Sequence, residues 1–319
     1  NTRTHTHTRH PVLVLVLVLE NLRTRPSLTE LYREIKIPNQ SPEFEIIKDL
    51  VNATITIHGN KCGSIYGQDS TEFIVTKITR IQNANLWHKY CYKKDNIIGK
   101  NRHRIPGCDS SKYLEMKPLL TPLSDKQSNE YWLFYGCNHP TTAQLVLAGY
   151  DPRVSNLEGM FDGGFYLAEN SSKSNQYIPC PRCGENAIST QIECTCLNQE
   201  QIDFKMILYR VILGDVHIAK TSDRNKYRDA INNNGQRSYV CRPPVKPNSM
   251  GDLYDSVMGE SMKNDGDQLR LNCEFILYEK GQTYPKYISD FQRSIHNMRP
   301  STNIKRVQDK CRNFLLNVF

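Results

Sequence analysis

Short apolar strands separated by glycine turns dominate the chain after Glu130, and this pattern constrains the fold more than any other feature. Residues 131–135, 204–214 and 274–278 are runs rich in apolar and β-branched side chains, which is typical of strands. Residues 42–55 instead show apolar side chains every three or four positions, as in a helix. Because strands are grouped and helices lie at their edges, we expect an α+β fold and not alternating βαβ units. Further helices are expected over 83–94, 141–148 and 171–177, and further strands over 73–81 and 165–168.

The composition allows one large folded domain or two modest ones. The chain has 319 residues, of which 38% are apolar and 23% are charged, and this excludes wholesale disorder. Its longest uninterrupted apolar run, Val12–Leu19, is far shorter than the roughly 20 residues that span a bilayer, so we expect no membrane partner. Eleven cysteines spread over the whole length favour a reducing compartment, nuclear or cytoplasmic, over a disulfide-stapled secreted domain.

The net charge of +8 suits an anionic partner only weakly, because the Lys and Arg residues are scattered along the chain. No basic helix suited to a nucleic-acid groove and no platform of aromatic residues among basic ones stands out. Nucleic-acid binding is therefore the weakest of the hypotheses.

Simple repeats mark the first part of the chain. Residues 1–10 repeat Thr with His or Arg, and Val12–Leu19 strictly alternates Val and Leu. We expect residues 1–40 to form a low-complexity or disordered leader, residues 41–291 to form the folded domain, and residues 292–319 to form a basic tail. Arg293 falls in this tail, where the expectation for a charged side chain is exposure to solvent.

Three stretches carry a resemblance to a known family. They are Asn129–Gly136 (NEYWLFYG), Gly159–Tyr177 (GMFDGGFYLAENSSKSNQY), and Cys273–Tyr278 (CEFILY) followed by Gln282–Ile288 (QTYPKYI). Together they resemble the catalytic domain of the poly(ADP-ribose) polymerases, which are diphtheria-toxin-like ADP-ribosyltransferases. The second stretch is closest to the tankyrase pattern GMFGAGIYFAENSSKSNQY.

The resemblance implies an ADP-ribosyltransferase fold, in which two small antiparallel sheets with flanking helices form a cleft for NAD. It implies an enzyme that transfers ADP-ribose from NAD to protein acceptors and releases nicotinamide. Chain elongation and self-modification are compatible with it. The resemblance assigns these residues to NAD binding: Gly136, Ser174, Tyr177, Tyr166, Lys173 and Arg153.

The catalytic triad implied by the resemblance is Tyr135, Tyr166 and Glu274. A carboxylate bonded to the ribose 2′-hydroxyl stabilises the positive charge that develops as the nicotinamide bond breaks, and Glu274 fills that position. In the family, Glu at this position goes with chain elongation. The first triad residue is usually His, and Tyr135 places its donor elsewhere. This departure leaves an alternative open, a catalytically weak or inactive module that binds NAD or ADP-ribose.

Four cysteines lie within seventeen residues: Cys180, Cys183, Cys194 and Cys196. A CxxC pair followed by a second pair is a common ligand set for tetrahedral zinc, although the CxC spacing of the second pair is less specific. Tankyrases carry a small zinc-binding insertion at the corresponding place. We therefore predict a structural zinc site over residues 180–196, with unligated thiols as the alternative.

Overall fold

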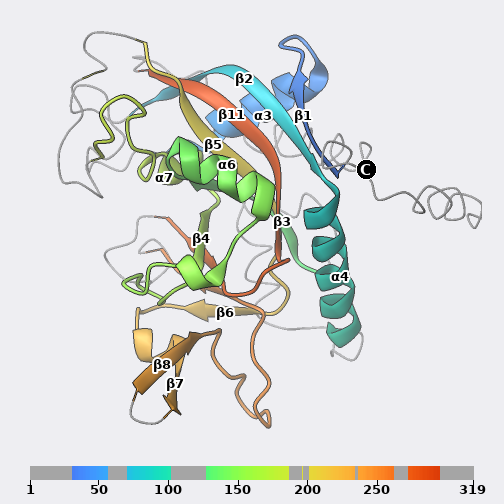
Figure 1. Cartoon of the computed structure of the whole chain (residues 1–319), viewed down its shortest axis with the longest axis vertical. Helices are drawn as coiled ribbons and strands as arrows, with labels where there is room; N and C mark the ends of the chain where they lie inside the picture. The colour runs from blue at the N-terminus through green and yellow to red at the C-terminus, as the bar shows by residue number, and fades with distance from the viewer. Residues whose placement is uncertain are drawn as a thin grey trace, which may run out of the picture.

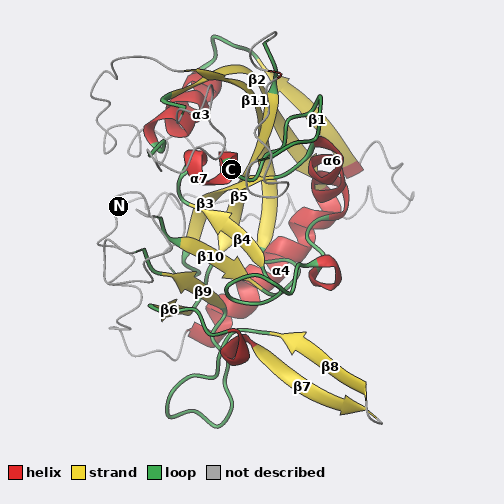
Figure 2. Cartoon of the chain, turned by 90° about the vertical axis from the view of Figure 1, so that its left-hand side faces the viewer, coloured by secondary structure: helices red, strands yellow, loops and turns green. Residues whose placement is uncertain are grey.

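The computed structural model describes residues 31–56, 70–101, 127–186, 196, 201–233, 236–261 and 272–294. Nine strands form one continuous sheet in the order β1-β2-β11-β5-β3-β4-β10-β9-β6 (Figures 1 and 2). Their bounds are β1 Tyr32–Ile37, β2 Glu72–Asn83, β3 Glu130–Gly136, β4 Phe165–Ala168, β5 Phe204–Ile212, β6 Val216–Ala219, β9 Ser256–Gly259, β10 Glu274–Leu277 and β11 Thr283–Ser294. A separate hairpin of β7 (Arg228–Asn233) and β8 (Gln236–Cys241) projects away from this sheet (Figure 2).

The nine-stranded sheet consists of two halves that meet at a single residue pair, Phe134 of β3 with Ala168 of β4. The larger half, from β1 to β3, is antiparallel throughout. In the smaller half β4, β10 and β9 are antiparallel, whereas β6 pairs with β9 in parallel. The arrangement agrees with the expected α+β fold with two small sheets, except for the parallel β6–β9 pair.

In the described part of the chain, four α-helices flank the strands: α3 Pro42–Ala53, α4 Ala84–Asn101, α6 His139–Ala148 and α7 Ser171–Asn175. The hydroxyl of Ser41 accepts a hydrogen bond from the amide of Phe44, and the side chain of Asn138 caps α6 in the same way. Helix α3 packs on β2, α6 on β5 and α7 on β3. Two 3₁₀ turns complete the described elements, η3 (Pro152–Val154) and η5 (Arg224–Tyr227).

Both faces of the central strands are buried. Leu133 and Phe134 are neighbours in β3, yet they belong to different apolar clusters, because successive side chains of a strand point to opposite faces. The same holds for Ile207 and Leu208 of β5. This double burial explains why β3 and β5 are almost continuously apolar in sequence.

The sheet extends beyond both ends of the predicted domain. Tyr32–Ile37 falls in the predicted leader but forms β1, which pairs with β2 along its whole length. Strand β11 continues to Ser294, beyond the predicted end of the domain at residue 291. Charged residues interrupt the apolar pattern in both segments, and their pairing partner β2 lies far away in sequence. Residues 1–30 and 295–319 lie outside the described residues.

The part of the chain that the structure describes contains no helix of the length and apolar character that crossing a bilayer requires.

Candidate functional site

Ala168 lies where the two halves of the sheet meet. It pairs with Phe134 of β3 on one side and with Glu274 of β10 on the other. Residues directly opposite each other in an antiparallel pair project from the same face, and so do alternate residues along one strand. Glu274 therefore projects from the same face as Tyr166, which lies two positions before Ala168.

The carboxylate of Glu274 forms an ion pair with Lys173 of α7, with 2.8 Å between Oε1 and Nζ. Both side chains are largely buried, at 9% and 16% exposure. Burial by itself lowers the pKa of Lys173, but Glu274 and the nearby Tyr177 outweigh burial and raise it above the ordinary value. Lys173 therefore stays charged at neutral pH, and its Nζ lies 5.3 Å from the centre of the Tyr177 ring.

Gly136 brings the end of β3 against the backbone of α7. A Cβ atom at position 136 would lie 1.9 Å from the carbonyl oxygen of Ser174, a distance that no side chain tolerates. Glycine is therefore required here by the close approach of two backbones. Ser174 is buried at this contact, whereas Tyr177, three residues later, is 45% exposed.

The hydroxyl group of Tyr166 is held by the backbone of the preceding turn. It accepts a hydrogen bond from the amide of Phe161 and donates one to the carbonyl of Asp162, both at 2.8 Å. Gly159 leaves room for this hydroxyl, because a Cβ there would lie 2.3 Å from it. These contacts fix the orientation of the Tyr166 ring.

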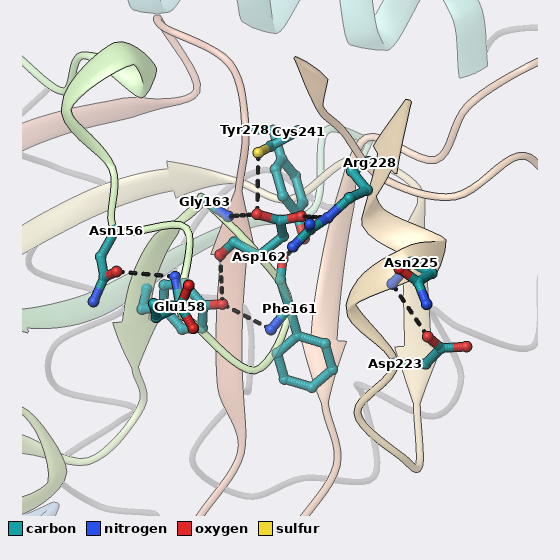
Figure 3. A network of polar contacts seen from close by, with 11 residues as sticks. Asn156, Glu158, Phe161, Asp162, Gly163, Asp223, Asn225, Arg228, Cys241 and Tyr278 are labelled. Atoms are coloured by element: carbon teal, nitrogen blue, oxygen red, sulfur yellow. Dashed lines mark hydrogen bonds and ion pairs between the residues drawn. The ribbon is translucent and has the colours of Figure 1, made fainter. Parts of the chain in front are cut away.

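A buried polar network around Asp162 holds this turn in place (Figure 3). Asp162 has a positive φ of 63°, in the left-handed region, and is 1% exposed. Its carboxylate accepts hydrogen bonds from the amide of Gly163 at 2.7 Å and the thiol of Cys241 at 3.3 Å, and it pairs with the guanidinium group of Arg228. Tyr278 donates to the carbonyl of Phe161 at 2.7 Å.

The sequence did not predict this network, although one residue in it departs from the family pattern. Asp162 stands where the tankyrase pattern has Gly, at a backbone conformation that Gly adopts freely. The partners Arg228 and Cys241 come from β7 and β8, so the network ties the projecting hairpin to the turn before Tyr166.

Tyr135 lies on the other side of β4 from Tyr166. Its ring packs on Phe165 with 4.4 Å between ring centres, and Phe165 stacks in turn on Tyr150 at 4.6 Å. Because Phe165 and Tyr166 are consecutive in a strand, their side chains point to opposite faces. The register therefore groups Tyr166 with Glu274 and leaves Tyr135 in a separate aromatic row. Burial raises the pKa of the Tyr135 hydroxyl, which stays protonated.

Arg153 extends from the turn that follows this aromatic row. Its side chain is 81% exposed, and its guanidinium group pairs with Asp151, with 2.5 Å between Nη2 and Oδ2. Tyr150, which ends the aromatic row, precedes Asp151, the N-cap residue of this turn, so Arg153 follows the row closely in sequence.

Cys137 follows Gly136 and donates to, or accepts from, the hydroxyl of Thr142 at 3.3 Å. Burial raises the pKa of its thiol to about 11, and the hydrogen bond to Thr142 opposes that rise only in part. The thiol is therefore protonated at neutral pH and is a poor nucleophile.

Three of the four predicted zinc ligands lie together. The sulfur atoms of Cys180, Cys183 and Cys196 are all within 4.8 Å of one another, although sixteen positions separate the first from the last. The amide of Gly184 donates to the carbonyl of Cys180 at 2.8 Å, which closes the turn that brings the first two thiols together. Cys194 lies outside the described residues.

Comparison with known proteins agrees with this geometry. A family model described as the poly(ADP-ribose) polymerase catalytic domain matches residues 41–293. Protein mono-ADP-ribosyltransferase PARP11 from Mus musculus is 24% identical over 264 residues, which cover 82% of this chain and 60% of the relative. The Homo sapiens protein of the same name is 25% identical, with coverage of 82% and 59%.

A second relative, Protein mono-ADP-ribosyltransferase PARP12 from Mus musculus, is 22% identical over 264 residues, or 82% of this chain and 26% of the relative. The chain thus spans three fifths or less of the length of these relatives.

Proposed function

Because the chain belongs to the poly(ADP-ribose) polymerase catalytic-domain family, we propose that it is an ADP-ribosyltransferase that uses NAD as its substrate. It would transfer ADP-ribose to a protein acceptor and release nicotinamide. The observation that carries this proposal is the strand register that sets Glu274 opposite Ala168, on the face of Tyr166 and in contact with Lys173. The names of the relatives, which are mono-ADP-ribosyltransferases, support the same chemistry.

In this proposal the contact between Gly136 and Ser174 holds the nicotinamide group. The backbone of Gly136 and the hydroxyl of Ser174 would bond the amide of nicotinamide, and the exposed ring of Tyr177 would stack on its flat cationic ring. Tyr166 would cover the other side with its ring, because its hydroxyl is already engaged by the turn.

Glu274 would act on the reacting bond. As the bond between the ribose C1′ and nicotinamide breaks, its electron pair moves to the nicotinamide ring and positive charge develops on the ribose. A carboxylate bonded to the 2′-hydroxyl stabilises that charge. The acceptor then bonds to C1′ and loses its proton. Lys173 would orient the carboxylate through its 2.8 Å ion pair.

The adenosine part of NAD would lie toward Tyr135 and Arg153. The aromatic row of Tyr135, Phe165 and Tyr150 leads to the turn that carries Arg153, whose exposed guanidinium group suits a phosphate or ribose oxygen. Tyr135 fills space in this row with a ring that is larger than that of histidine.

The competing function is a module that binds NAD or ADP-ribose without turnover. It rests on tyrosine in place of histidine at position 135, and the names of the relatives, which are mono-ADP-ribosyltransferases, do not favour it. Two further features bear on the product. Glu274 favours elongation by the family rule, whereas the names of the relatives indicate transfer of single units.

Incubation with NAD labelled in its adenylate phosphate, followed by a denaturing gel, tests the proposal. We expect label on the protein itself or on added acceptor proteins, and its loss in Glu274→Gln. A discrete band indicates single transfer, and a ladder or smear indicates elongation. Absence of label at saturating NAD, together with measurable NAD binding, would establish the binding module instead.

We also propose a structural zinc ion bound by Cys180, Cys183, Cys194 and Cys196. The grouping of three of these thiols supports the proposal, and four thiolates would close the coordination sphere. Elemental analysis should find about one zinc per chain in protein purified without chelator. Cys183→Ser should lose the zinc, whereas Cys91→Ser in α4 should retain it; an equal absence of zinc from both would refute the site.

We also propose that the protein works in a reducing compartment, nuclear or cytoplasmic. The cysteines that the structure describes form no disulfide bond, in keeping with such a compartment.

A further inference from the structure

Helix α7 is too short to be stable on its own, although it contains several residues of the proposed site. It has only five residues, from Ser171 to Asn175, and its N-cap residue Asn170 makes no side-chain capping bond. A single helical turn is unfavourable in isolation, because nucleation costs more than one turn of hydrogen bonds returns. The conformation of Lys173, Ser174 and the following Tyr177 therefore depends on contacts from elsewhere.

The beginning of α7 is fixed by the end of α3. The hydroxyl of Ser171 donates to the carbonyl of Val51 at 2.6 Å, and the side-chain amide of Asn170 donates to the carbonyl of Thr54 at 3.2 Å. The amide of Thr56 donates to the hydroxyl of Ser172 at 2.8 Å. These bonds hold the first half of the helix, before the residues that would meet nicotinamide.

The end of α7 is held by Arg293 of β11. Its Nε donates to the side-chain oxygen of Asn175 at 2.9 Å. Its Nη2 donates to the backbone carbonyls of Asn175 at 3.3 Å and Ile178 at 3.1 Å. Asn175 and Ile178 lie on either side of Tyr177. The last carbonyls of a helix lack partners within it, and a cation there also favours the helix dipole.

Arg293 is itself rigidly placed. It is paired with Phe73 of β2 in the sheet register, and its guanidinium group lies 3.7 Å from the centre of the Phe204 ring. A planar guanidinium group can stack on a ring and donate along its edge at the same time, which the ammonium group of lysine cannot do. Three hydrogen bonds and one ring contact thus converge on a single side chain near the end of the last strand.

We propose that Arg293 is a positioning residue for the nicotinamide end of the site: it acts through Asn175 and Ile178 to fix Ser174 and the Tyr177 ring without touching substrate. This inference rests on the proposed function. It gives a role in the site to a residue beyond the boundary that the sequence indicated, and nothing in the resemblance assigns Arg293 to NAD binding.

The test compares Arg293→Lys and Arg293→Met with Gln292→Ala. Gln292 is the neighbouring residue of β11, and its side chain bonds Asp203 at the surface, so it is a matched control. Calorimetric binding of nicotinamide and of NAD is measured for each folded variant, with kcat and KM for nicotinamide release. Thermal unfolding is followed in parallel.

We expect Arg293→Met to weaken nicotinamide binding and to raise KM for NAD by the same factor, about tenfold or more, since hydrogen bonds from a charged group are lost. The value of kcat should change much less, because Arg293 bonds α7 only at and after Asn175, whereas Lys173, which contacts Glu274, precedes that end of the helix. Arg293→Lys should fall between wild type and Arg293→Met, and Gln292→Ala should match wild type.

A lower unfolding temperature with unchanged nicotinamide affinity and KM would show that Arg293 is only structural, and would overturn the inference. If Arg293→Met does not fold, the same comparison is decided by Arg293→Lys. Failure of the wild-type protein to bind either nicotinamide or NAD would instead refute the proposed function, and the inference with it.

Discussion

Tyr135 occupies a position where its ring is well packed among other aromatic rings. The ring lies 4.4 Å from Phe165 and 6.4 Å from Tyr209, on the face of β4 away from Tyr166. Aromatic pairs of this kind contribute roughly 0.5–1.5 kcal/mol beyond their buried area. At the scale of the single residue, the tyrosine thus stabilises the fold in a place where the family uses histidine to hold NAD.

Tyr135→His should therefore improve NAD binding at some cost to stability. One recovered hydrogen bond in a partly buried site is worth on the order of 1–3 kcal/mol, or roughly a 5- to 150-fold decrease in KM. We expect kcat to stay near the wild-type value, because the reacting bond is handled by Glu274. Steady-state kinetics of nicotinamide release over a range of NAD concentrations measures both constants. A change confined to kcat would show that position 135 acts on the chemical step.

At the scale of the element, the most demanding contact is the one between the end of β3 and α7. Gly136 has no room for a side chain, since the nearest obstacle is the backbone carbonyl of Ser174. Any substitution must push α7 away from the sheet, and with it Lys173 and Tyr177. Gly99, in the last turn of α4, has no atom within 4 Å of its missing Cβ and serves as a matched control.

Gly136→Ala should lower both the stability and the affinity for nicotinamide, whereas Gly99→Ala should leave binding unchanged. Replacing a helical glycine by alanine stabilises a protein by about 0.5–1 kcal/mol, so Gly99→Ala should raise the free energy of unfolding. Urea unfolding and calorimetric binding of nicotinamide provide the two readouts. Wild-type affinity in Gly136→Ala would contradict the assignment of the nicotinamide subsite to this contact.

The elements that the sequence predicted are those with strong local patterns. Strands β3, β5 and β10 are apolar runs, and α3 and α6 begin at capping residues, Ser41 and Asn138. Strand β1 and the last residues of β11 were not predicted. Their charged side chains interrupt the apolar pattern of a strand, and both segments are defined by pairing with β2.

Residues of the candidate site could be named from the sequence where a motif is continuous, as in the stretch from Gly159 to Tyr177. Contacts between distant segments could not be predicted from the sequence. The pairing of Asp162 with Arg228 and the bonds of Arg293 to α7 join residues separated by 66 and 118 positions, and neither pair has a local sequence pattern. Charged residues of this kind are exposed by default in a sequence-based prediction.

At the scale of the whole molecule, Glu130 ties the sheet to α4. Its fully buried carboxylate accepts hydrogen bonds from Tyr90 and Arg210, both at 2.6 Å, and pairs with Lys94 at 2.6 Å. Burial by itself raises the pKa of Glu130, but Arg210, Lys94 and Tyr90 outweigh burial and hold it below its ordinary value of 4.5.

A lowered pKa in the folded state means that Glu130 contributes stability above its unfolded-state pKa, and that this contribution is lost as the pH falls through the folded-state pKa. We expect Glu130→Gln to cost about 3–5 kcal/mol near pH 7, since it leaves Arg210 buried without its partner charge. Urea unfolding between pH 3 and 7 should show a difference in the free energy of unfolding between wild type and variant that becomes smaller as the pH falls. A difference that is constant over this range would exclude the ion pair as its source.

The proposed function depends above all on the claim that the face shared by Tyr166 and Glu274 cleaves the bond between ribose and nicotinamide. The most direct measurement is the rate of nicotinamide release from NAD by wild type and by Glu274→Gln, with NAD affinity determined separately by calorimetry. Loss of a group that stabilises charge only in the transition state should lower kcat by about 100-fold or more and leave NAD affinity nearly unchanged. Equal rates for the two proteins at saturating NAD would contradict the claim.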